Sequence, residues 1–135
     1  MLVDTAGFGN RAAAVAMTSA DAVLIPTLSG EPDITEAEKT VRLVEGLARA
    51  ARRDIPARVV LNRVKRTQLA RHAAREIASA ALPMLTATLA DLVAYGEMTF
   101  SGRIPDQGLA AEELTRLVAE LREIGWIPQR EDVLT

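Results

Sequence analysis

The chain has 135 residues, of which 49% are hydrophobic and 25% charged. These values are typical of one globular domain and exclude a disordered or fibrous chain. The absence of cysteine excludes disulfides, thiolate metal sites and a cysteine nucleophile, and His72 is the only imidazole. No apolar stretch approaches the ~18 residues of a membrane span, and the N-terminus does not resemble a signal peptide. We therefore expect a cytoplasmic protein.

The charge is unevenly distributed along the sequence. The window Arg49–Arg75 holds nine cations and the single acid Asp54, a net charge of +8, whereas the whole chain carries −2. This basic window predicts a polyanionic partner. An alternative interpretation is that its arginines lie on solvated helix faces and pair with acids elsewhere in the chain.

The first half of the chain predicts strands that alternate with helices. The expected strands are Leu2–Thr5 and Asp21–Pro26, each a short apolar run. Gly7 and Gly9 indicate a turn before a helix over Ala12–Met17. A longer helix is expected to begin at Thr35, where Thr35 and Glu38 form a capping-box pattern, and to end near Arg53.

The second half continues this alternation. It predicts strands over Ala57–Asn62 and Met84–Leu89 and helices over Thr67–Ala81, Leu92–Phe100 and Leu109–Ile124. Gly125 is expected to terminate the last helix. The apolar residues of that helix predict its buried face: Ala110, Leu114, Leu117, Val118 and Leu121.

This order predicts an α/β fold, a three-layer parallel sheet flanked by helices, because parallel strands need crossover helices. One domain is expected over residues 1–128, with a tail over 129–135. Ligands of such sheets bind at the carboxyl ends of the strands. The polar residues expected there are Asp4, Thr5, Thr27 and Asn62.

The segment Val3–Gly9 places a carboxylate at the end of an apolar strand, directly before glycines. This arrangement suits a metal-bound phosphate, because the acid can orient Mg²⁺ and glycine amides can approach the phosphate closely. Gly7, Gly9 and Ala12 also match a dinucleotide-binding pattern, but Asp21 lies at the wrong end of the next strand. A purely structural turn is the third interpretation.

Asn62 closes the strand VVLN, where a side-chain amide can both donate to and accept from an adenine edge, although asparagine at this position is also a common turn former. The order and spacing of DTAG, LIP, LNRV and ALPMLTATLADLVAY resemble the C-terminal half of ParA-type partition ATPases of the ParA/MinD family. The resemblance extends from Leu2 to about Ile124.

This resemblance implies a deviant-Walker P-loop fold that binds ATP and Mg²⁺, dimerises and helps to segregate plasmids or chromosomes on the nucleoid. Asp4 would be the Walker B acid, catalytic and bound to magnesium through water. Thr5 to Gly7 would form the switch loop at the γ-phosphate, with Thr5 and Gly7 as nucleotide contacts, and Asn62 would contact adenine. The family often has a proline pair where this chain has Ala6 and Gly7. A centromere-binding partition protein would be a partner, and no membrane would be involved.

The family's lysine-bearing phosphate loop has no counterpart in this sequence. The only lysines are Lys39 and Lys65, and neither follows a glycine. Without that loop nothing neutralises the β- and γ-phosphates, so we expect no ATPase activity from the chain alone. The fold would be incomplete at its N-terminus. A second copy or a completing chain is expected to pair with Leu2–Thr5.

The basic window fits nonspecific duplex DNA, since phosphate contacts carry no sequence information. The expected DNA-binding residues are Arg63, Lys65, Arg66, Arg71 and Arg75. The competing hypothesis is a noncatalytic α/β interaction module with a basic face for protein or RNA. No role is predicted for His72, Tyr95 or Trp126.

Overall fold

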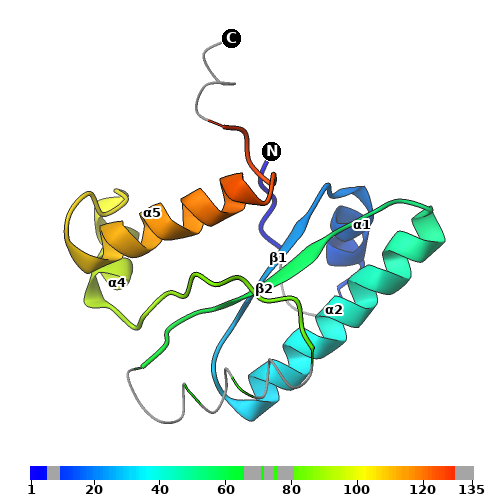
Figure 1. Ribbon diagram of the computed structural model, residues 1–135, viewed down its shortest axis with the longest axis horizontal. Coiled ribbons are helices and arrows are strands. Elements are labelled where there is room, and N and C mark those ends of the chain that lie inside the picture. Colours follow the sequence, from blue (N-terminus) through cyan, green and yellow to red (C-terminus); the bar gives the residue numbers. More distant parts are fainter. Residues whose placement is uncertain (6–9, 66–70, 72–74, 76–80, 130–135) are drawn as a thin grey trace.

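The computed structural model describes residues 1–5, 10–65, 71, 75 and 81–129 (Figure 1). Its named elements are α1 (Arg11–Ser19), β1 (Val23–Thr27), α2 (Glu31–Ala51), β2 (Ala57–Leu61), α4 (Val93–Ser101) and α5 (Gly108–Glu123). The α/β class is therefore confirmed, and the predicted helices around Ala12–Met17, Leu92–Phe100 and Leu109–Ile124 correspond to α1, α4 and α5.

The sheet has two parallel strands, with a register that runs from Val23 beside Ala57 to Thr27 beside Leu61. The segment from residue 83 to residue 91 follows β2 in the same direction and joins it at two isolated bridges. The predicted strand over Met84–Leu89 is thus present only as bridged, extended backbone. The described residues do not form the three-layer sheet that the sequence predicted.

The core lies between the sheet and α2, which runs alongside both strands (Figure 1). Ile25, Ala37, Val41 and Val59 form one buried cluster, and Val59 has no exposed surface at all. Ala37 and Val41 lie four residues apart on one face of α2. In β2 the consecutive residues Val59, Val60 and Leu61 are all buried, so this strand is covered on both faces. The core therefore fixes β1, α2 and β2 against one another.

The predicted strand over Leu2–Thr5 is wrong: residues 1–5 have no regular structure. Leu2 is 98% exposed and Val3 53% exposed. An apolar run becomes a strand only when another strand satisfies its backbone groups, and no described strand pairs with this one.

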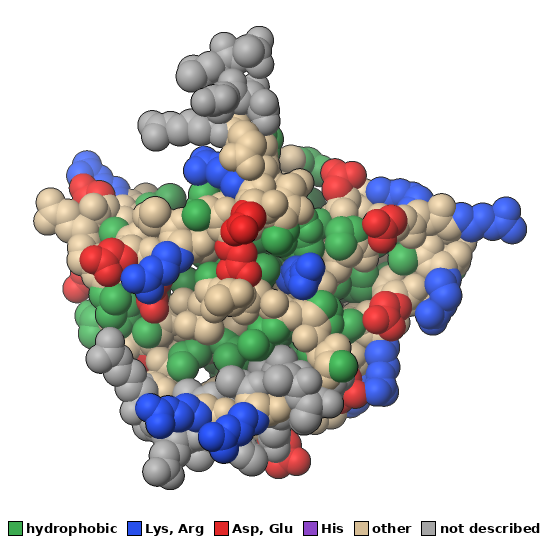
Figure 2. Space-filling view, viewed as in Figure 1, with side chains coloured by type: hydrophobic (Ala, Val, Ile, Leu, Met, Phe, Trp, Pro, Cys, Tyr) green, Lys and Arg blue, Asp and Glu red, His purple; other side chains and the backbone are tan. Residues whose placement is uncertain are grey.

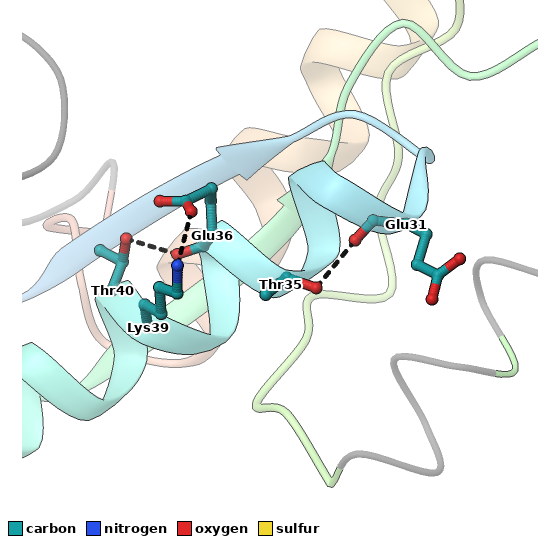
Figure 3. A network of polar contacts seen from close by, with 5 residues as sticks. All are labelled: Glu31, Thr35, Glu36, Lys39 and Thr40. Atoms are coloured by element: carbon teal, nitrogen blue, oxygen red, sulfur yellow. Dashed lines mark hydrogen bonds and ion pairs between the residues drawn. The ribbon is translucent and has the colours of Figure 1, made fainter.

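The start of α2 also differs from the prediction. The helix begins at Glu31 after the N-cap Gly30, four residues before Thr35. The Thr35 hydroxyl donates to the carbonyl oxygen of Glu31 at 3.1 Å, as Figure 3 shows, so it does not cap the helix. Pro32 in the first turn explains the early start, since its fixed φ suits that position.

Two further boundaries differ from expectation. Pro26 lies within β1, which continues to Thr27. The amide of Val23 donates to Pro56 and the carbonyl oxygen of Thr27 accepts from Asn62, so β1 is hydrogen-bonded on both sides of the proline. The predicted helix over Thr67–Ala81 lies largely outside the described residues, although Arg71 and Arg75 are helical.

Candidate functional site

The carboxyl ends of β1 and β2 meet, as the prediction for a parallel sheet requires. The amide of Asn62 donates to the carbonyl oxygen of Thr27 at 2.8 Å. Thr27 is only 6% exposed, and its hydroxyl donates to the carbonyl oxygen of Asp33. Thr27 and Asn62 therefore form a fixed edge, whereas the predicted companions Asp4 and Thr5 are not positioned by a strand.

The Asn62 side chain is oriented by the residue that follows it. Its Oδ1 accepts a hydrogen bond from the backbone amide of Arg63 at 3.0 Å. Arg63 has a φ of 54°, a left-handed conformation that turns the chain away from β2. No described residue accepts a hydrogen bond from Asn62 Nδ2. This group is thus available as a donor, which the proposed adenine contact requires.

The bridged segment 83–91 lies beside the end of β2 that carries Asn62. Leu89 donates to Leu61 at 2.9 Å, and Val64 donates back to Leu89 at 3.0 Å. Asp91 then donates to the carbonyl oxygen of Val64 at 3.1 Å, and its carboxylate lies 3.8 Å from Arg63 Nε. The segment is therefore held beside Asn62 by backbone bonds and by one exposed, weak ion pair.

Two carboxylates of α5 accept hydrogen bonds from backbone amides of the segment 83–91. These amides do not donate to β2. Glu120 accepts from the amides of Thr86 and Ala87, both at 2.7 Å. Glu113 accepts from the amide of Ala90, with both carboxylate oxygens at 3.1 Å. Figure 1 shows α4 and α5 together on one side of the molecule. Neither acid was predicted from the sequence, although both share a helix face with the apolar residues of α5.

Tyr95 completes this cluster. Its hydroxyl donates to Glu113 Oε1 at 2.7 Å. Burial, followed by the hydrogen bond to Glu113 and the negative charge of Glu113, raises the pKa of Tyr95 above its ordinary value. The phenol is thereby held protonated as a donor to Glu113. The tyrosine, to which no role was predicted, has a structural one.

The remaining predicted site residues are not gathered at the Asn62 edge. Asp4 and Thr5 are exposed, and Gly7 and Arg66 lie outside the described residues. Lys65, Arg71 and Arg75 are exposed. Within the described part of the chain, no group of three or more His, Cys, Asp or Glu residues could hold a metal ion. The roles of these residues remain predictions.

Not every cation of the basic window faces solvent freely. Arg53 donates through Nη2 to the carbonyl oxygen of Ala20 at 3.1 Å and through Nη1 to that of Thr18. Its guanidinium thus binds the C-terminal end of α1. Figure 2 shows Lys and Arg side chains over the C-terminal end of α2, interleaved with Asp and Glu. The window is therefore less uniformly basic in space than in sequence.

A hollow of about 250 Å³ lies between β1 and the first turns of α2. Its lining includes the acids Asp33 and Glu36, and Glu36 pairs with Lys39 at 3.0 Å (Figure 3). Acidic walls repel phosphate groups. Among the described residues, neither this hollow nor the end of β2 at Asn62 presents the glycine-rich amides and the lysine that bind a triphosphate.

Comparison with known protein families shows to which family the chain belongs. The family model described as VirC1 protein matches residues 1–125. The chain belongs to the VirC1 family. This family is ParA-like, so membership supports a partition-related role and agrees with the resemblance found in the sequence. Neither the curated proteins nor the solved structures include a match.

The VirC1 family match covers every named element, from α1 to α5, and the segment 83–91. None of the described helices is long and apolar enough to span a membrane.

Proposed function

We propose that this chain is a segment of a ParA-like partition ATPase that acts in ATP-dependent segregation of plasmids or chromosomes. The observation that carries the proposal is the VirC1 family match over residues 1–125. The Asn62 edge agrees with it, because a donor at the carboxyl end of a buried parallel strand suits a base-binding residue.

In this proposal Asn62 contacts adenine, and Asp4, Thr5 and Gly7 act at the phosphates and at Mg²⁺. The sequence lacks a lysine after a glycine, and a second copy of the chain in a homodimer would lack it too, so a completing chain supplies the phosphate-binding group. Arg63, Lys65, Arg66, Arg71 and Arg75 contact duplex DNA nonspecifically. The protein is nucleoid-associated and works with a centromere-binding partition protein.

A nucleotide-binding experiment tests this proposal. The full chain is titrated with a fluorescent ATP analogue, together with Asn62→Asp and the control Gln107→Glu. Asn62→Asp keeps the acceptor for the Arg63 amide but removes the donor, so binding should weaken, whereas the exposed Gln107 lies away from this edge. Wild-type and Asn62→Asp chains that bind equally would contradict the adenine contact.

Hydrolysis gives the second test. The chain alone should not hydrolyse ATP, because the lysine that stabilises the transferred phosphate is missing. Magnesium-dependent turnover that is abolished in Asp4→Ala and kept in the exposed control Asp54→Ala would overturn this expectation.

One observation favours the second candidate, a noncatalytic interaction module. No residue of α4 is buried, and Val93 and Phe100 are 80% and 93% exposed. Ile104, in the loop after α4, is 72% exposed. Exposed apolar residues of this kind favour a protein partner. An Asn62→Asp chain that segregates a plasmid normally, together with a Phe100→Ser chain that fails to do so, would support this candidate over the ATPase.

A further inference from the structure

One side of β1 carries backbone groups that no described strand uses. In a parallel pair, alternate residues of a strand direct both their N–H and their C=O group to the same neighbour. Val23 donates toward β2, to the carbonyl oxygen of Pro56. Leu24 and Pro26 therefore direct their backbone groups to the other side, along which no described strand lies. We call this side the open edge of β1.

The open edge is suited to an extended chain. It offers one donor, the amide of Leu24, and two acceptors, the carbonyl oxygens of Leu24 and Pro26. Pro26 fits an edge, because its missing N–H costs the pairing with β2 nothing. The Leu24 side chain is 37% exposed, on the sheet face opposite to the buried Ile25. A strand laid along this edge would bond to the backbone and cover the leucine.

The hollow of about 250 Å³ lies beside the same strand, on the sheet face that α2 covers. Its lining combines Ile25 and Ala37, from the core cluster, with the acids Asp33 and Glu36. Figure 3 shows Glu36 on the part of α2 that runs beside β1. Every second side chain of a strand added to the open edge would point to this face. The hollow is therefore placed to receive such a side chain.

The charges around the hollow favour a cation. Asp33 and Glu36 contribute two negative charges, and Lys39 offsets one of them through its ion pair with Glu36 at 3.0 Å. Both side chains of that pair are 53% exposed, so the pair is weak and an incoming cation can replace Lys39. Lysine and arginine have an apolar stem and a charged end, which match the apolar and acidic parts of the lining.

We infer that the open edge of β1 is a docking surface for an extended segment of a partner protein that places a lysine or arginine in the hollow. Backbone bonds to Leu24 and Pro26 give the affinity, and the hollow selects the basic side chain. This inference goes beyond the proposed function and does not depend on nucleotide binding.

Peptide binding to the full chain tests the inference. The probe is a short labelled peptide of alternating valine and threonine, with arginine in place of the central threonine. A matched peptide carries glutamate at that position. Two further peptides are N-methylated either at all valines or at all other residues, so that each has one edge blocked. The protein variants are Glu36→Gln and the control Glu38→Gln, which changes an acid of α2 outside the lining of the hollow.

We expect the arginine peptide to bind and the glutamate peptide to bind much more weakly, since Asp33 and Glu36 repel it. Glu36→Gln should weaken the arginine peptide about two- to fivefold, the range of an exposed ion pair, and Glu38→Gln should not. Only one N-methylated peptide should lose binding, because only one edge of the added strand faces β1. Hydrogen exchange followed by NMR should show new protection of the Leu24 amide, whereas the Ile25 amide already bonds toward β2.

Failure of the arginine peptide to bind, or equal binding of the arginine and glutamate peptides, would overturn the inference. Equal losses in Glu36→Gln and Glu38→Gln, or binding that leaves the Leu24 amide unprotected, would do the same. Protection of Leu24 that rises with protein concentration in the absence of peptide would show that a second copy of the chain covers the edge, which also contradicts the inference. None of these results bears on the nucleotide titrations, so the proposed function is decided separately.

Discussion

The hydroxyl of Thr27 donates to the carbonyl oxygen of Asp33 at 3.1 Å and thereby ties the end of β1 to the first turn of α2. Thr27 is only 6% exposed, so the lost bond would be poorly compensated by water. This contact spans the loop between the two elements.

Replacing Thr27 with Val should lower the free energy of unfolding by about 1 kcal/mol, the net worth of a typical hydrogen bond. Urea unfolding followed by circular dichroism measures the change. The control is Thr35→Val, whose hydroxyl makes a similar bond in an exposed position. Equal destabilisation of both variants would show that burial of the Thr27 hydroxyl adds nothing.

Duplex DNA binding should depend on the exposed pair Arg71 and Arg75. Reversing both charges, as Arg71→Glu with Arg75→Glu, should weaken binding to all sequences alike. It should also reduce the slope of log affinity against log salt by up to about 0.9 for each phosphate that the protein no longer neutralises. Fluorescence anisotropy at several salt concentrations measures both quantities.

The control for this experiment reverses two exposed arginines outside the basic window, Arg103 and Arg116. It changes the net charge by the same amount. Identical effects of the two double variants would show that DNA binding depends on the net charge alone and not on Arg71 and Arg75. A strong preference for one DNA sequence would contradict nonspecific contact.

The contact between Tyr95 and Glu113 predicts a pH dependence of stability. Folding raises the pKa of Tyr95, so the native protein holds the phenol proton more tightly than the unfolded chain does. Its contribution should therefore be fully present below the ordinary value of about 10 and be lost as the pH rises above it.

Chemical unfolding of wild type and Tyr95→Phe at pH 8 and pH 11, followed by the fluorescence of the single Trp126, measures this contribution. The stability difference between the two proteins should shrink at the higher pH. A difference that stays constant would show that ionisation of Tyr95 does not matter for folding.

The exposed N-terminal segment predicts self-association or pairing with a completing chain. Leu2 and Val3 present apolar surface to water, so replacing both with serine should shift sedimentation profiles at several concentrations toward the monomer. Val15→Ser, at a residue 63% exposed on α1, is the control. A wild-type monomer with full hydrogen-exchange protection across Leu2–Thr5 would contradict the prediction.

Much of the fold follows from patterns within single elements. Periodic apolar residues predicted α2 and α5, the Ala-rich stretch after two glycines predicted α1, and short β-branched runs predicted β1 and β2. The start of α2 was misplaced because two start signals lie close together in the sequence. Pro32 after Gly30 and the pair Thr35 and Glu38 each fit a helix N-terminus, and the first of them is the one the structure uses.

The errors concern features that depend on distant partners. Leu2–Thr5 has the composition of a strand but no described strand beside it. The buried face of α5 includes Glu113, because the carboxylate finds its donors in a segment 23 residues away along the chain. The sequence predicted Asn62 as the last residue of a strand, whereas β2 ends at Leu61 and Asn62 directly follows it. Its contact with the amide of Arg63 is a local bond for which the sequence offered no signal.

The carboxylates of α5 also bear on how strands could add to the sheet. An outer strand invites another chain through its unpaired amides. In the segment 83–91, the amides of Thr86, Ala87 and Ala90 already donate to Glu120 and Glu113. A foreign strand would have to displace two carboxylates to pair there. On the side of β1 that faces away from β2, no described carboxylate binds the strand in this way. Only Pro26, which has no backbone N–H, weakens pairing there. Growth of the sheet is thus opposed beyond the segment 83–91 by two carboxylates and beyond β1 only by a proline, so an added strand meets less resistance on the β1 side.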